Sequence, residues 1–282
     1  MRTHYIAWLS AAGTTRQVAD MLADLLHRHG IEARMVDLGP AGGADIAALG
    51  AAVPSAACVW LGSPVYVDHA LPQVLEFIHA LPDVDPNGSA VAVPFVTWGA
   101  VCSGVALAEM ALELKRKGWR SIGAAKVLAQ HSSMWNSSVP LAQGRPDATD
   151  RAQLEMLVTR VLARLATGEP QTLAPEELNY LPAARAQEAQ EKSLAKMKML
   201  LGEHQPQHER CDRCGICIKL CPVGALSWKG EYPQVGESCV RCHQCTRHCP
   251  QQAFPFNATM MEERLQQLAA ASPEVAETQI YL

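Results

Sequence analysis

Apolar and polar positions follow two patterns over the first 166 residues. Short apolar runs predict strands, and apolar positions spaced three and four apart predict helices. The strand-like runs are 3–9, 31–38, 56–62, 90–98 and 124–130, and the helix-like segments are 15–29, 69–81, 104–117 and 150–166. Because parallel neighbours need crossover connections, this order predicts an α/β fold with a doubly wound, five-stranded parallel sheet.

The pattern changes after residue 166. The segment 167–182 contains three prolines and predicts a linker, and 184–202 is rich in residues that favour helix. A cysteine-rich stretch follows, and 261–271 predicts a last helix. We therefore expect four parts: a first domain at 1–166, a linker and bridging helix at 167–203, a cysteine-rich domain at 204–256, and a helix with a tail at 257–282.

Composition and charge narrow the class of protein. The 282 residues are 49% hydrophobic and 18% charged, which favours a large core over disorder. The net charge of −4 gives no basic excess, so nucleic acid is not an expected partner. We see no convincing leader and no apolar run long enough for a membrane span. We therefore expect a cytoplasmic protein whose ten cysteines are reduced thiols.

Eight of the ten cysteines form two copies of one spacing. The first copy is Cys211, Cys214, Cys217 and Cys221, and the second is Cys239, Cys242, Cys245 and Cys249. A proline follows each copy, as in bacterial ferredoxins. Structural zinc usually takes a pair of ligands from each of two separated knuckles, and disulfide frameworks belong to small secreted domains. The repeat therefore predicts two [4Fe–4S] clusters.

In two-cluster ferredoxins, the fourth cysteine of each copy ligates the other cluster. Carried over to this chain, that rule gives Cys211, Cys214, Cys217 and Cys249 for one cluster. It gives Cys239, Cys242, Cys245 and Cys221 for the second. His243 and His248 lie inside the second copy, and we expect them to be solvent-facing or hydrogen-bonding neighbours that tune the cluster rather than ligands.

A hydroxyl-rich turn joins the first strand to the first helix. It runs Ser10, Ala11, Ala12, Gly13, Thr14 and Thr15. Hydroxyls, backbone N–H groups and a helix N-terminus together can cradle a phosphate. No lysine lies in the loop, which argues against a GxxxxGK[ST] nucleotide loop. An ordinary helix cap would have a similar composition.

Two more loops should lie at the same edge of the sheet. Pro64, Val65 and Tyr66 follow the third strand, and Thr97, Trp98 and Gly99 follow the fourth. Ligands of open α/β sheets bind at the carboxyl ends of strands. Tyr66 and Trp98 could pack against a flat ring, or they could simply cap the sheet. Cys102 could touch a ligand, although a buried thiol is the simpler reading.

These motifs resemble the flavodoxin-fused ferredoxins over residues 3–165 and 205–255. The resemblance implies a flavodoxin-like domain with FMN, joined to an α+β two-cluster ferredoxin-like domain. It implies that residues 10–15 form the FMN phosphate loop, that 64–66 and 97–99 flank the flavin, and that Cys102 lies close by. Ala12 departs from the family pattern, because a hydroxyl is common at that position.

The expected function is intramolecular electron transfer between two [4Fe–4S] clusters and FMN, serving a redox partner protein or a small-molecule electron acceptor. Tethering the two modules replaces a diffusional encounter by an intramolecular one. The alternative is an FMN-dependent reductase of a small substrate, fed by its own clusters, so whether the protein is an enzyme stays open. A third reading is a flavin-free scaffold, which Ala12 alone supports. The polar loop at 130–138 could contact flavin, substrate or the cysteine-rich module, or be plain surface.

Overall fold

The computed structural model describes residues 2–40, 45–168 and 170–282. Its main sheet has five parallel strands in the order β2-β1-β3-β4-β6. They are β1 (His4–Trp8), β2 (Ala33–Asp37), β3 (Cys58–Pro64), β4 (Val91–Trp98) and β6 (Ala124–Leu128). This is the strand order of flavodoxin-like sheets, whose ligands bind at the switch point between β1 and β3. The predicted α/β fold class is confirmed.

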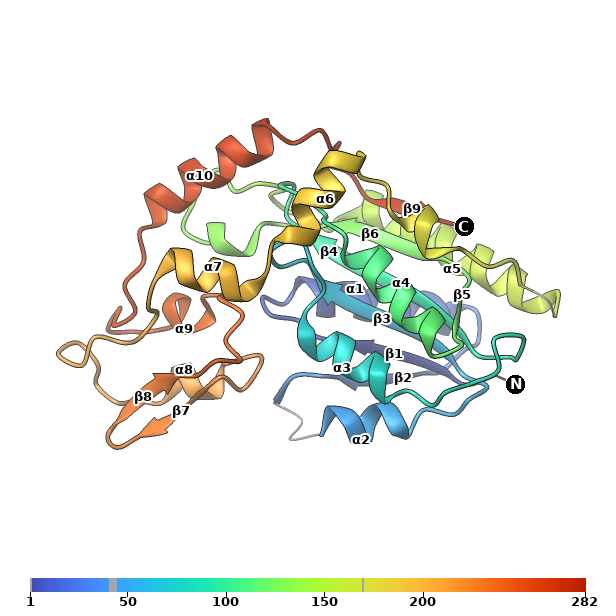
Figure 1. Cartoon of the computed structure of the whole chain (residues 1–282), viewed down its shortest axis with the longest axis horizontal. Coiled ribbons are helices and arrows are strands. Elements are labelled where there is room, and N and C mark those ends of the chain that lie inside the picture. Colours follow the sequence, from blue (N-terminus) through green and yellow to red (C-terminus); the bar gives the residue numbers. More distant parts are fainter. Residues whose placement is uncertain (1, 41–44, 169) are drawn as a thin grey trace.

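Helices cover both faces of this sheet (Figure 1). One face carries α1 (Thr14–Arg28) and α5 (Ala148–Ala166), and the other carries α2 (Ile46–Ala51), α3 (Pro72–Ala80) and α4 (Ala106–Arg116). Every residue of β3 and β4 is buried as a result. Strands covered on both faces need continuous apolar runs, which is why their pattern is so clear in the sequence.

The sheet also has two short strands that the sequence pattern does not predict. β5 (Arg120–Ser121) pairs with β4. β9 (Gln279–Tyr281) pairs antiparallel with β6. The residues after the cysteine-rich module therefore return to the first domain and complete its sheet.

The segment between the two modules packs against the first domain. Leu173 and Leu178 are buried, the latter in the 3-10 helix η3 (Pro175–Leu178). The predicted bridging helix is two helices, α6 (Ala183–Glu191) and α7 (Leu194–Leu201). Lys192 is extended, and Ser193 caps α7 by accepting a hydrogen bond from Lys196 N–H at 3.2 Å.

The cysteine-rich module is a small α+β unit beside the end of the sheet (Figure 1, orange). It consists of α8 (Ile216–Lys219), the hairpin of β7 (Leu226–Lys229) and β8 (Tyr232–Val235), and α9 (Gln244–Arg247). Its buried core consists largely of cysteines, with Phe254 beside them. From there α10 (Ala258–Ala270) leads back towards β9. None of the helices in the described part of the chain is both long and apolar enough to cross a membrane.

Candidate cofactor sites

The loop after β1 is tightly wound. Gly13 has φ 98°, a left-handed conformation that favours glycine, and α1 begins directly after it. The N–H groups of Gly13 and Arg16 both donate to Ser10 Oγ at 3.1 Å. Because this oxygen already accepts two hydrogen bonds, what Ser10 can still offer a ligand is its own proton.

The predicted phosphate loop and the end of β4 are joined by a buried contact. Thr15 is 1% exposed, and its Oγ1 lies 2.8 Å from Thr97 Oγ1. Each of these two hydroxyls therefore has a partner inside the protein. Ala11 is buried in the core and offers a ligand only its backbone. The donors that remain at this loop are the amides at the start of α1, which are the orphan donors of any helix, and the hydroxyl of Thr14.

A cavity of about 340 Å³ opens beside this loop. Ala12 and Thr14 form one side of it, and His131, Ser132 and Trp135, from the loop after β6, form another. Arg247 reaches it from the cysteine-rich module. A helix N-terminus facing a cavity suits an anion such as a phosphate.

The loop after β3 turns sharply. Tyr66 and His69 exchange two backbone hydrogen bonds of 3.0 Å, and the residues between them, Val67 and Asp68, have φ 52° and 68°. A positive φ is costly for a β-branched valine, and such strain is often found at functional sites. Gly104 is needed beside the turn, because a Cβ there would lie 2.0 Å from the carbonyl oxygen of Asp68.

Tyr66 is held between two parts of the molecule. Its hydroxyl lies 3.4 Å from Ser132 Oγ in the loop after β6. Burial raises the pKa of Tyr66, and the nearby thiol of Cys242 adds to the effect. Val65 N–H donates to Thr97 O at 2.9 Å, so the two predicted flavin loops are hydrogen-bonded to each other.

Trp98 is buried rather than accessible to a ligand at the sheet edge. It is 2% exposed, and Lys126 Nζ lies 5.1 Å from its ring on the face of the sheet opposite α1. Cys102 is half-buried under α6, and burial raises the pKa of its thiol to about 12, with Asp68 adding to the effect. Gly99 faces His131, whose ring carbon Cδ2 would lie 2.6 Å from a Cβ at that position.

The loop after β6 lines the cavity and contacts the cysteine-rich module. It contains η2 (Ser132–Met134), and burial lowers the pKa of His131 to about 4, so this ring is neutral. Trp135 stacks on Phe256 at a centroid distance of 4.7 Å. This stack joins the loop to the cysteine-rich module.

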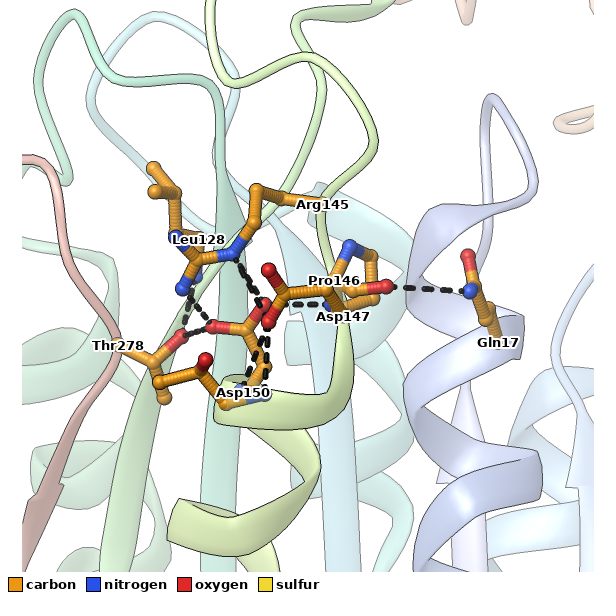
Figure 2. Close-up of polar contacts among 8 residues, drawn as sticks. Gln17, Leu128, Arg145, Pro146, Asp147, Asp150 and Thr278 are labelled. Carbon is orange, nitrogen blue, oxygen red and sulfur yellow. Dashed lines mark hydrogen bonds and ion pairs between the residues drawn. The ribbon is translucent and has the colours of Figure 1, made fainter.

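A polar network fixes the far end of this loop (Figure 2). Arg145 forms a two-point ion pair with Asp150, which is fully buried and also accepts a hydrogen bond from Thr278 Oγ1. Burial raises the pKa of Asp150, but hydrogen bonds from Arg145, Thr278 and the N–H of Asp147 lower it below the ordinary value. Gln17 Nε2 donates to Pro146 O at 3.5 Å and ties the loop to α1.

The two cysteine motifs have the same backbone shape. Arg213 and Arg241 have φ 62° and 57°, and Gly215 and His243 have φ 71° and 60°. Each motif then enters a four-residue helix, α8 or α9. The repeat seen in the sequence is therefore a repeat of loop conformation as well.

Among the described residues, no three His, Cys, Asp or Glu side chains converge on one metal-ion position. The thiols lie instead in two looser sets, which the neighbours of three cysteines reveal. Burial raises the pKa of Cys217 to about 11, and the nearby thiols of Cys211, Cys214 and Cys249 raise it further. Burial raises the pKa of Cys242 to about 12, and the nearby thiols of Cys221 and Cys239 add to the effect. Burial also raises the pKa of Cys245 to about 12, with the thiols of Cys242 and Cys239 adding to it.

Cys217 thus has the fourth cysteine of the second motif among its neighbours, and Cys242 has the fourth cysteine of the first. Backbone N–H groups point at several of the sulfurs. Those of Ala225, Ala253 and Arg241 lie 3.1, 3.3 and 3.4 Å from the Sγ atoms of Cys221, Cys249 and Cys239. Such donors stabilise thiolates bound to iron and tune a cluster's potential.

Two histidines lie beside the second set of thiols. His204 Nε2 is 3.2 Å from Cys245 Sγ, and burial lowers the pKa of His204 to about 4. His243 is 7% exposed, with its ring 5.2 Å from that of His204. Burial lowers the pKa of His243 to about 3. His243 is therefore not solvent-facing. The sequence did not point to His204, because this residue lies outside the cysteine motif.

The second motif faces the sheet edge, and Val223, just after the first motif, packs there as well. Cys242 and Val240 pack in the same apolar cluster as Leu38, Val65 and Tyr66 of the first domain. Cys214 of the first motif is exposed. The module is thus docked with one thiol set towards the predicted flavin loops and the other towards the surface.

Comparison with known protein families supports a cluster-binding role for the first cysteine motif. A scan against protein-family models matched residues 205–227 to a family described as a 4Fe-4S binding domain. That stretch contains the whole first cysteine motif. A search of curated proteins found no match.

Solved structures resemble the first domain. A rubredoxin oxygen:oxidoreductase from Desulfovibrio gigas is 16% identical over 59% of this chain and 37% of that chain, with a TM-score of 0.44. A flavodoxin from the domain Archaea is 15% identical over 58% of this chain and 99% of that chain, with a TM-score of 0.43. Flavodoxin 1 from Bacillus cereus is 17% identical over 57% of this chain and 97% of that chain, with a TM-score of 0.44.

The strand order described above is flavodoxin-like, and the stretch that matches a 4Fe-4S binding domain follows it in the chain. This combination indicates a protein that transfers electrons.

Proposed function

We propose that this chain is an electron-transfer flavoprotein that holds FMN at the carboxyl edge of its sheet and two [4Fe–4S] clusters in its C-terminal module. The observation that carries the proposal is the docking of the second cysteine motif. Cys242 packs in one apolar cluster with Val65 and Tyr66, which lie on a predicted flavin loop. Electrons could then pass between the two modules within one chain.

The residues at the sheet edge fit a flavin mononucleotide. The start of α1 offers amide donors for the phosphate, and the Tyr66 turn and Ser132 border the region where the ring would lie. Bound FMN exchanges electrons singly or in pairs, whereas iron–sulfur clusters pass them one at a time. The protein's part is to hold these groups close together and to exclude water.

The cysteine sets fit two clusters. Cys211, Cys214, Cys217 and Cys249 would ligate the first, and Cys239, Cys242, Cys245 and Cys221 the second. Because Cys214 is exposed, the first cluster would meet the redox partner protein. Because Cys242 and Cys245 are buried, the second would serve the flavin.

The closed sheet edge favours a relay over a reductase. Trp135 stacks on Phe256 on one side, and α6 covers the loops after β3 and β4, with His69 Nε2 2.9 Å from Ala189 O. A reductase needs an open flavin face for its small substrate. The cavity of about 340 Å³ beside Ser132 is the feature that favours the alternative function, an FMN-dependent reductase.

The first experiment is to purify the protein anaerobically and measure flavin, iron and acid-labile sulfide per chain. We expect one FMN with about eight iron and eight sulfide. Cys249→Ala should leave about four iron, because its set loses one ligand, while Cys58→Ala, a core thiol, should leave all of them. Full iron with no flavin, even after incubation with excess FMN, would refute both the relay and the reductase.

A further inference from the structure

The cavity beside the phosphate loop has a wall that comes from the other module. Ala12 and Thr14 line it from the first domain, and Arg247 lines it from α9. Arg247 is exposed and lies between the cluster cysteines Cys245 and Cys249 in the chain. A cation of the C-terminal module is therefore placed at the site that the proposed function gives to the FMN phosphate.

Other cations near the loop are already engaged. Arg145 lines the same cavity, but Asp150 and Asp147 hold its guanidinium. Arg16 lies 3.8 Å from Asp20 on the exposed side of α1. Arg247 has no ion pair with any residue that the structure describes.

The loop itself has few donors to spare for a doubly charged phosphate. Ser10 Oγ already accepts two N–H groups, and the hydroxyl of Thr15 pairs with that of Thr97. Ala12 has no hydroxyl at all. His131 is neutral, because burial lowers its pKa to about 4. The site thus has amides, a helix terminus and the hydroxyl of Thr14, but its own domain supplies only the charge of Arg145, which is already paired with Asp150 and Asp147.

We propose that Arg247 binds the phosphate of FMN from the cysteine-rich module, so that flavin retention depends on that module being docked. This inference rests on the proposed function. A guanidinium donates charge-assisted hydrogen bonds to a phosphate, which are stronger than neutral ones. Because α9 is built between cluster ligands, loss of the second cluster would displace Arg247 and weaken FMN binding.

The test compares FMN with riboflavin, which lacks the phosphate. Cluster-replete, flavin-free protein is titrated anaerobically with each flavin, and binding is followed by quenching of flavin fluorescence. Arg247→Gln should raise the Kd for FMN by about ten- to a hundredfold, as expected for a hydrogen bond between charged groups. Its Kd for riboflavin should not change. Arg210→Gln removes an exposed arginine of the same module away from the cavity and serves as the control.

Each outcome decides the question. An unchanged Kd for FMN in Arg247→Gln overturns the inference, and so does an equal loss for both flavins, which would mean that Arg247 only positions the module. Arg247→Lys keeps the charge and should retain part of the FMN preference. An iron assay on each variant confirms that the clusters are in place. If the unmodified protein binds neither flavin, the proposed function itself fails.

Discussion

Replacing Glu274 with glutamine removes the negative charge from an ion pair that joins the C-terminal tail to the sheet. Lys126 Nζ lies 2.9 Å from Glu274 Oε1, and the two side chains are 3% and 6% exposed. Glu274 also accepts a 2.8 Å hydrogen bond from Ser103 N–H. The rings of Trp98 and Tyr180 lie 5.1 and 4.4 Å from Lys126 Nζ.

The substitution leaves the ammonium group of Lys126 buried without its anion. Breaking one half of a buried pair costs about 3–5 kcal/mol. The two aromatic rings still attract the cation, and the glutamine carbonyl can still accept a hydrogen bond, so the lower end of that range applies. About 3 kcal/mol corresponds to roughly a hundredfold change in the equilibrium for releasing the tail.

Hydrogen exchange measures this release directly. The amides of β9 are protected by pairing with β6, so they exchange when the tail opens. Mass spectrometry of peptides spanning 272–282, on cluster-replete protein under anaerobic conditions, should show roughly hundredfold faster exchange in Glu274→Gln. Glu277→Gln is the matched control, because Glu277 is an exposed carboxylate of the same tail whose contact is Gln279 Nε2 at 2.7 Å.

The double variant Lys126→Met, Glu274→Gln separates the buried charge from the lost contact. It should exchange more slowly than Glu274→Gln alone, because no unpaired charge is left in the core. Exchange in Glu274→Gln within threefold of the unmodified protein would refute the reasoning. A double variant as fast as the single one would show that the ion pair, and not the stranded charge, sets the cost.

Two further substitutions test the sites described above. His204→Leu removes the ring beside Cys245 Sγ and should lower the midpoint potential of the second cluster by on the order of 50 mV, since a lost N–H···S bond disfavours the more negative reduced state. Potentiometry followed by electron paramagnetic resonance would measure it, and an equal shift in His208→Leu, an exposed histidine, would contradict it. Asp150→Asn should lower the free energy of unfolding by on the order of 3 kcal/mol at pH 7, because Arg145 loses its buried partner. The pKa of Asp150 is lowered in the folded state. The difference in unfolding free energy between the variant and the unmodified protein should therefore persist above the ordinary carboxyl pKa and vanish as the pH falls through the pKa of the folded state. A constant difference in urea titrations across that pH range would argue against an ionic role.

The main strands and the cysteine loops could be predicted because their signals are local. β3 and β4 are buried on both faces and are therefore apolar at nearly every position. The cysteine spacing fixes the loop shape within eleven residues, as the matching φ angles of Arg213 and Arg241 illustrate. The pairing of a fourth cysteine from the other motif came from the resemblance to ferredoxins.

The parts that escaped prediction depend on contacts between distant residues. Asp150 and Thr278 are 128 positions apart, and nothing in the sequence near either residue indicates that they meet. His204 reaches Cys245 across 41 positions. The same holds for β9, whose three residues have no strand pattern of their own.

The position of Trp98 could have been predicted better. Side chains alternate along a strand, so neighbours such as Thr97 and Trp98 point to opposite faces. Thr97 contacts Thr15 at the start of α1, which leaves Trp98 on the other face beside Lys126. The prediction treated residues 97–99 as one loop surface, although the predicted strand 90–98, like the observed β4, includes both Thr97 and Trp98.

The late pairing of β9 with β6 has a consequence for how this protein is made. Leu128 and Thr278, which are hydrogen-bonded where the two strands meet, are 150 positions apart. At ribosomal rates of 5–20 residues per second, the edge of β6 would wait roughly 8 to 30 s for its partner. During that time an unpaired strand edge is a template for aggregation. Both cysteine motifs are synthesised within the same interval, so a nascent chain must protect this edge while its thiols await iron.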